Sequence, residues 1–276
     1  MDFKNKFYYM LAPLEDMTDS CFRTICHRYG ADLTMTELIR FESLAKNNKS
    51  SWDRLKLYDD TPTQVQLIGT RDIFLKKFLS MFSSEKGFVG FNLNLGCPAP
   101  NIVSNGAGSA MIKRISKTKK LVDIIKNKGY DVSIKMRLGL NQFEKDNKVY
   151  LNLINSVDAD FFVVHARHAK QSYGEKADWK VFSECVATGK NIIANGDIKT
   201  REDVEKIKSF GCKGIMIGRA AIINPLIFAE LKGMTLPPAA QVQKEYEQLI
   251  KERDPPFRYR KNIFKHQEKT VEFKEG

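Results

Sequence analysis

The chain has 276 residues, 42% of them hydrophobic, so it is long enough for one large domain with a sizeable core and too hydrophobic for a disordered protein. Lys and Arg outnumber Asp and Glu by 45 to 33, which gives a net charge of +12. An excess of this size favours a polyanionic partner, nucleic acid above all, although a lysine-rich proteome would leave the same signature.

Cysteine usage and the lack of long apolar runs indicate a soluble, cytoplasmic protein. The five cysteines are odd in number and widely spread, as is typical of a reducing compartment. No stretch approaches the roughly 18 apolar residues of a membrane helix, and the first residues do not resemble a secretory signal. Without a Cys-x-x-Cys pair, or clear carboxylate or cysteine partners for the histidines, we expect no metal site.

Short apolar runs alternate with amphipathic stretches along most of the chain, which predicts a parallel sheet covered by helices. Eight such runs favour an α/β fold of the closed (β/α)8 TIM-barrel type over an open sheet, because the first strand lacks the Gly-x-Gly-x-x-Gly turn of a dinucleotide fold. We expect strands near residues 7–13, 31–36, 63–68, 88–95, 132–136, 161–165, 191–194 and 214–217. We expect helices at 18–29, 70–82, 117–128, 146–156, 178–187, 201–210 and 221–232, with a less regular segment at 38–58.

The pattern changes after residue 232, so we expect a catalytic barrel at 1–232 and a short, basic, helical segment at 233–276. Gly233 and the pair Pro237 and Pro238 end the last barrel helix, and residues 239–252 have the pattern of a short helix. The segment is too short for a substantial independent domain.

Polar residues follow most predicted strands at their carboxyl ends. In a (β/α)8 barrel these ends meet on one face, which carries the active site. Any one of these residues could be a solvated loop residue, but that interpretation is weak for a set that recurs at successive strands. Together with Pro13 and Gly218, which stand at the same strand ends, they are Glu15, Glu37, Gln66, Asn94, Cys97, Lys135, Arg137, His165, Arg167, Asn195, Asp197 and Arg219.

Cys97 stands between Gly96 and Pro98, just past a predicted buried strand. An unperturbed cysteine thiol is mostly protonated at pH 7, which suits a proton donor better than a nucleophile. The alternative is a buried structural cysteine, since free cysteines are among the most buried residues. Its position in a Gly–Cys–Pro turn at a strand end favours the proton donor.

Lys135 lies at the inward, carboxyl end of the fifth predicted strand. A lysine inside a barrel is costly unless it is paired or faces a negative charge on a ligand. A reduced flavin offers such a charge at its N1–C2=O edge, and a structural ion pair with Glu15 or Asp197 is the alternative. Gly218 and Arg219 lie where barrels of this type commonly bind a phosphate.

Together these motifs resemble the tRNA-dihydrouridine synthases, an FMN-dependent family, from about Leu11 to Phe228. Leu14 stands where the family usually has Met, a volume-conserving change. The family normally carries a helical C-terminal domain, of which only the start fits in 233–276, so that domain is reduced, divergent or truncated here. The matching segments are LAPLEDMTDSCFR at 11–23, NLGCPAPNIVSNGAGSAM at 94–111, SIKMRLG at 133–139, VVHARHAKQSYGEKADW at 163–179, IANGDI at 193–198 and GIMIGRAAIINPLIF at 214–228.

The resemblance implies reduction of the C5–C6 bond of uracil in tRNA, with NADPH or NADH reducing FMN and Cys97 as the general acid. It implies a target base that leaves its stack, and substrate contacts from Asn94, Arg137 and Arg167, the two arginines holding tRNA phosphates at the rim. It implies no protein partner. The implied FMN contacts are Pro13, Leu14, Glu15, Gln66, Lys135, His165, Asn195, Gly196, Asp197, Gly218 and Arg219.

Two other functions stay open. One is another FMN barrel of the dihydroorotate-dehydrogenase type, acting on a free pyrimidine, against which the net charge and the segment 165–179 argue. The other is a non-catalytic tRNA-binding relative, against which the presence of both Cys97 and Lys135 argues.

Overall fold

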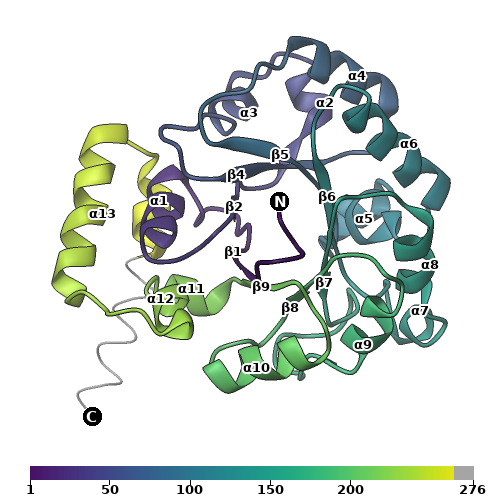
Figure 1. The fold of residues 1–276 in the computed structure, drawn as a ribbon. Helices are drawn as coiled ribbons and strands as arrows, with labels where there is room; N and C mark the ends of the chain where they lie inside the picture. The colour runs from purple at the N-terminus through teal and green to yellow at the C-terminus, as the bar shows by residue number, and fades with distance from the viewer. Residues whose placement is uncertain (264–276) are drawn as a thin grey trace.

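The computed structural model describes residues 1–263, which form a (β/α)8 barrel followed by a helical segment (Figure 1). Parallel strands run around it in the order β1-β9-β8-β7-β6-β5-β4-β2, and a parallel bridge between Met10 and Leu33 closes the circle. The barrel strands are β1 (Tyr8–Leu11), β2 (Thr34–Met35), β4 (Thr63–Ile68), β5 (Phe88–Leu95), β6 (Val132–Met136), β7 (Phe162–His165), β8 (Ile192–Asn195) and β9 (Gly214–Ile217). All eight expected strands are confirmed.

Helices surround the strands, and short helices that were not expected lie at Pro100–Ser104, Gly108–Met111 and Gln142–Asp146. Two expected segments also differ in the structure. The segment 38–58 contains a short strand, β3 (Ile39–Arg40), which pairs with β4, and two short helices. The helix expected at 221–232 is divided, because Pro225 has no amide hydrogen to continue a helix. The helices are α1 (Ser20–Arg28), α2 (Phe41–Leu44), α3 (Lys49–Asp53), α4 (Asp72–Met81), α5 (Pro100–Ser104), the 3-10 turn η1 (Gly108–Met111), α6 (Ile115–Lys126), α7 (Gln142–Asp146), α8 (Val149–Ser156), α9 (Val181–Val186), α10 (Arg201–Ser209), α11 (Arg219–Ile223), α12 (Ile227–Lys232) and α13 (Ala239–Arg253).

The amino ends of the strands are closed by an apolar plug. Tyr8, Phe161 and Ile193 are buried together inside the barrel. Phe3 lies against this cluster, with its ring centroid 5.1 Å from that of Tyr8 and 5.4 Å from that of Phe161, and Figure 1 shows the N-terminus near the barrel axis. The plug leaves the carboxyl ends of the strands as the open end.

The segment after the barrel packs on the side of α1. Figure 1 shows α13 beside α1, outside the ring of barrel helices. Arg253 fixes this arrangement with an ion pair to Asp59 at 2.8 Å and a hydrogen bond to the Ser20 carbonyl at 3.0 Å. No described helix is both long and apolar enough to span a membrane.

Candidate active site

The main cavity opens at the carboxyl ends of β1 and β6 to β9, and we call it the first cavity. It has a volume of about 650 Å³, within the range of small-molecule and cofactor sites. The sequence-predicted residues that line it are Pro13, Leu14, Lys135, His165, Asn195, Gly196, Asp197, Gly218 and Arg219.

Lys135 projects into the first cavity from the end of β6 and pairs with no acidic residue in the described part of the chain. Burial, together with the positive charge of Arg137, lowers the pKa of its ammonium to about 8. The ion pairs considered as alternatives do not form, because Glu15 pairs with Arg54 and Asp197 pairs with arginines. Lys135 is therefore a cation available to an anionic ligand.

His165 ends β7 beside Lys135 and is a neutral imidazole. Burial lowers its pKa to about 2, and the nearby charges of Lys135, Arg137 and Arg167 act in the same direction. Its Nε2 lies 3.3 Å from an Arg167 guanidinium nitrogen, which can only donate, so Nε2 is placed to accept a hydrogen bond. His165 can therefore present an N–H from Nδ1 without carrying a charge.

Arg167 is a buried structural residue, which corrects the expectation of a phosphate contact at the rim. Its side chain is fully buried and forms an ion pair with Asp197 at 2.5 Å. It also donates to the Glu175 carbonyl, so it ties the loop after β7 to the end of β8. Arg137 is likewise buried, and it donates to the His168 carbonyl at 2.9 Å.

The ends of β8 and β9 are held tightly. Asn195 donates to the Met216 carbonyl at 2.9 Å, and Trp179 donates to the Gly196 carbonyl at 2.8 Å. Gly196 has a φ of +122°, and a Cβ there would meet His165 at 3.1 Å, so only glycine fits without strain. Arg219 is half exposed and reaches Asp197 at 3.2 Å.

Inside the barrel, a chain of side-chain amides leads to the Cys97 turn. Gln66 donates to Asn92 at 2.7 Å and accepts from Asn94 at 2.9 Å. Asn94 in turn accepts from the backbone amides of Gly96 and Cys97, at 3.1 and 2.9 Å. Neither Gln66 nor Asn94 lines the first cavity; they hold the turn that carries the thiol.

Cys97 is partly buried and lines a neighbouring second cavity of about 500 Å³. Its carbonyl accepts from both the backbone amide and the hydroxyl of Ser109, each at 3.0 Å. Gly108 makes this approach possible, because a Cβ there would lie 2.5 Å from the Cys97 carbonyl oxygen. The thiol is also close enough to Lys135 for a thiolate to raise the pKa of that lysine.

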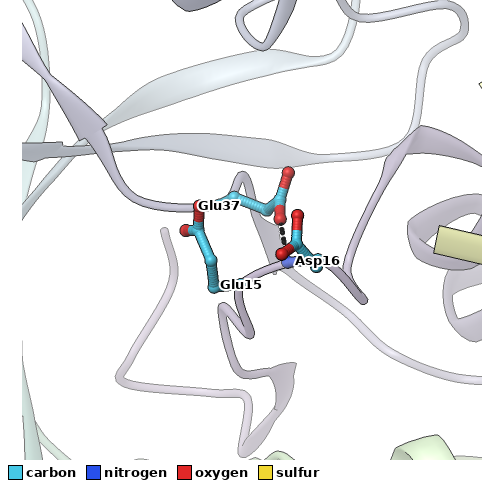
Figure 2. Close-up of side chains that lie close together, drawn as sticks. All are labelled: Glu15, Asp16 and Glu37. Atoms are coloured by element: carbon cyan, nitrogen blue, oxygen red, sulfur yellow. Dashed lines mark hydrogen bonds between the residues drawn. The ribbon is translucent and has the colours of Figure 1, made fainter. Parts of the chain in front are cut away.

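Glu15 lies in the second cavity rather than the first, although Leu14 lines the first. Figure 2 shows Glu15, Asp16 and Glu37 close together, with the Asp16 amide donating to Glu37. Each carboxylate has a protein partner: Glu15 has Arg54 at 2.6 Å, Asp16 has Arg258 at 2.5 Å, and Glu37 accepts from Tyr259. The contacts of Arg258 and Tyr259 anchor the C-terminal helical segment to the loops after β1 and β2.

Tyr173 is a site residue that was not predicted. It lies in the loop after β7, lines the first cavity and is 55% exposed. The Arg219 guanidinium lies 4.2 Å from its ring centroid, and the His165 ring stacks on it with centroids 6.0 Å apart. The way the loop after β7 folds brings the Tyr173 ring to the first cavity. The sequence of this loop has no hydrophobic periodicity from which that position could be predicted.

A family model described as dihydrouridine synthase (Dus) matches residues 10–273. The chain belongs to the dihydrouridine synthase family. A probable tRNA-dihydrouridine synthase from Helicobacter pylori is 31% identical over 89% of this chain and 76% of its own length. Similar proteins from Aquifex aeolicus and Bacillus subtilis are each 32% identical, over 84% and 80% of this chain and 74% and 71% of their own lengths. Among solved structures, a FabK mutant from Thermotoga maritima has a TM-score of 0.49 and 12% identity over 80% of this chain and 63% of that one.

Membership of the dihydrouridine synthase family identifies the chain as an oxidoreductase of tRNA processing. Most residues that the resemblance implied for the flavin line the first cavity, whereas Glu15 lines the second and Gln66 lies in the barrel interior. Of the implied substrate residues, Asn94 adjoins Cys97, and both arginines lie below the rim. The site therefore has two parts, one lined by Lys135 and one by Cys97.

Proposed function

We propose that this chain reduces the C5–C6 bond of uracil bases in tRNA, with FMN in the first cavity and NADPH or NADH as the reductant. The observation that carries the proposal is the pairing of Lys135, a cation without an acidic partner among the described residues, with the partly exposed Cys97 thiol close by. The positive net charge of +12 fits a polyanionic substrate.

The first cavity fits a flavin mononucleotide. Its volume of about 650 Å³ lies within the range of cofactor sites. Lys135 would face the anionic edge of a reduced flavin, and the neutral His165 would offer a hydrogen bond. Gly218 and the half-exposed Arg219 would hold the phosphate at the ends of β8 and β9.

Bound FMN would take a hydride from the reduced nicotinamide and supply it to C6 of the uracil. Cys97 gives its thiol proton to C5, so the C5–C6 double bond becomes single and the base gains two hydrogens. The thiolate left behind is stabilised by the ammonium of Lys135 and takes up a proton from solvent. Asn94 holds the turn so that the thiol faces the base.

The target base must leave its stack to reach this pair of groups. Cys97 lines the second cavity, so the target base can approach the thiol from that side. We also expect a cytoplasmic enzyme, where unmodified tRNA is present.

The test is to incubate the purified chain with FMN, NADPH and unmodified tRNA, and to measure dihydrouridine by mass spectrometry of the nucleosides. We expect dihydrouridine in tRNA and no reduction of free uracil or oxidation of dihydroorotate. Turnover of the free pyrimidines without tRNA turnover would support the dehydrogenase alternative. A colourless protein that takes up no FMN would support the non-catalytic alternative and contradict the proposal.

A further inference from the structure

Besides Glu15, the second cavity is lined by two segments that are distant in sequence. Cys97, Ala99 and Ile102 line it from the loop and helix after β5. The segment 38–54 lines it from the direction of β3, with mainly polar groups. Its volume of about 500 Å³ exceeds what a thiol proton donor needs and lies within the range of ligand sites.

The polar groups on that segment are donors suited to an anion. Arg40 is exposed, and its side chain forms no hydrogen bond or ion pair with another residue in the range 1–263. Ser43 and Ser50 line the same cavity, and their hydroxyls can each donate one hydrogen bond. Arg54 is different, since Glu15 neutralises it at 2.6 Å. The uncompensated positive charge of the cavity is therefore that of Arg40.

The position of Cys97 constrains what binds here. If Cys97 protonates C5 of a uracil, the ribose and phosphate attached to that base must leave the site beside the thiol. Phosphate contacts from arginine, serine and backbone groups are the usual way in which proteins fix the register of a nucleic acid. The nicotinamide of NADPH or NADH has no need to approach Cys97, so we do not expect the phosphates of the reductant to lie against Arg40.

We infer that the second cavity is a nucleotide site in which Arg40, with Ser43 and Ser50, binds the RNA backbone phosphate next to the uridine that is reduced. This rests on the proposed function and adds a substrate-positioning residue to it. Arg40 acts on the RNA backbone and touches neither the flavin nor the reacting bond.

The experiment measures initial rates against tRNA concentration at several salt concentrations for wild type and Arg40→Gln. We expect the KM for tRNA to rise about 3- to 10-fold, and the slope of log KM against log salt to fall by about 0.7 to 0.9, as for the loss of one phosphate contact. Arg40→Lys keeps the charge and should recover most of the affinity. The matched control is Lys128→Gln, in the loop between α6 and β6 at the opposite end of the barrel, which should leave the KM and the slope unchanged.

A second arm measures flavin reduction by NADPH without tRNA, in which Arg40→Gln should equal wild type. A raised KM for NADPH with an unchanged KM for tRNA would place the reductant's phosphate at Arg40 and overturn the inference. Equal tRNA kinetics for Arg40→Gln and wild type would overturn it as well. A wild type that binds FMN but forms no dihydrouridine would instead contradict the proposed function itself.

Discussion

The backbone amide of Cys97 donates a hydrogen bond to the side-chain oxygen of Asn94 at 2.9 Å, so the residue near the end of β5 fixes the turn that carries the thiol. The side-chain nitrogen of Asn94 donates a hydrogen bond to Gln66, which is buried and donates a hydrogen bond to Asn92. A chain of amides thus connects the barrel interior to the proposed proton donor.

Replacing Asn94 with alanine should misplace the thiol without removing the flavin. We expect dihydrouridine formation to slow on the order of 10- to 100-fold, the size of effect that a small misplacement of a reacting group produces. The FMN content should equal that of wild type, since Asn94 does not line the first cavity. Asn152→Ala, on the exposed face of α8, is the matched control. An Asn94→Ala enzyme with wild-type turnover would exclude this positioning role.

Gly108 should matter more than another glycine with a similar backbone conformation. Gly108 has a φ of +57° and a Cβ there would strike the Cys97 carbonyl, whereas Gly129 has a φ of +81° with nothing near its Cβ position. Alanine at Gly129 should cost about 1 kcal/mol of stability from backbone strain, and alanine at Gly108 should cost more because its Cβ also meets the Cys97 carbonyl. Only Gly108→Ala should also slow dihydrouridine formation. Equal activity of the two variants would show that the turn tolerates displacement.

FMN affinity should fall as Lys135 loses its proton. The folded-state pKa of Lys135 is lowered to about 8 from 10.5, so without ligand the free energy of unfolding should rise between these two pH values, where only the unfolded chain holds the proton. The ring of oxidised FMN is uncharged, but its carbonyl edge accepts a stronger hydrogen bond from the protonated ammonium than from the neutral amine, so the Kd of FMN should increase above pH 8. Fluorescence titration of FMN from pH 7 to 9.5 measures this, and Lys135→Met should give weaker binding with a flatter profile. Identical profiles for the two proteins would contradict the contact.

Arg167 should contribute to stability rather than to tRNA affinity. Removing it leaves the partly exposed Asp197 with Arg219 as its remaining ion-pair partner and removes the hydrogen bonds to the Glu175 carbonyl, so we expect a loss of about 1–3 kcal/mol. Urea denaturation of Arg167→Met measures this loss. If the variant folds, its slope of log KM against log salt should equal that of wild type. A smaller slope for the variant would show that Arg167 contacts a tRNA phosphate, contrary to what the burial of its side chain indicates.

The sequence predicted the barrel well, because buried parallel strands are continuous apolar runs whose order defines the topology. It also placed Lys135 and Cys97 at the correct strand ends. The sequence did not predict that Leu14 and Glu15 line different cavities, because the directions of neighbouring side chains in an irregular loop follow no period. Hydrophobic periodicity could not predict that Arg167 is buried or that Tyr173 is exposed, since both depend on how the loop after β7 folds.

The most direct test of the account is a single-turnover experiment on Cys97→Ala. The variant and wild type are loaded with FMN, reduced with NADPH and mixed with unmodified tRNA, and flavin reoxidation is followed by absorbance. Cys212→Ala, at a buried cysteine away from both cavities, is the control. We expect Cys97→Ala to hold FMN and accept reducing equivalents like wild type, yet to be reoxidised by tRNA at least about 100-fold more slowly, the loss typical of a missing general acid. Reoxidation at the wild-type rate, with dihydrouridine formed, would contradict the role of Cys97 as proton donor.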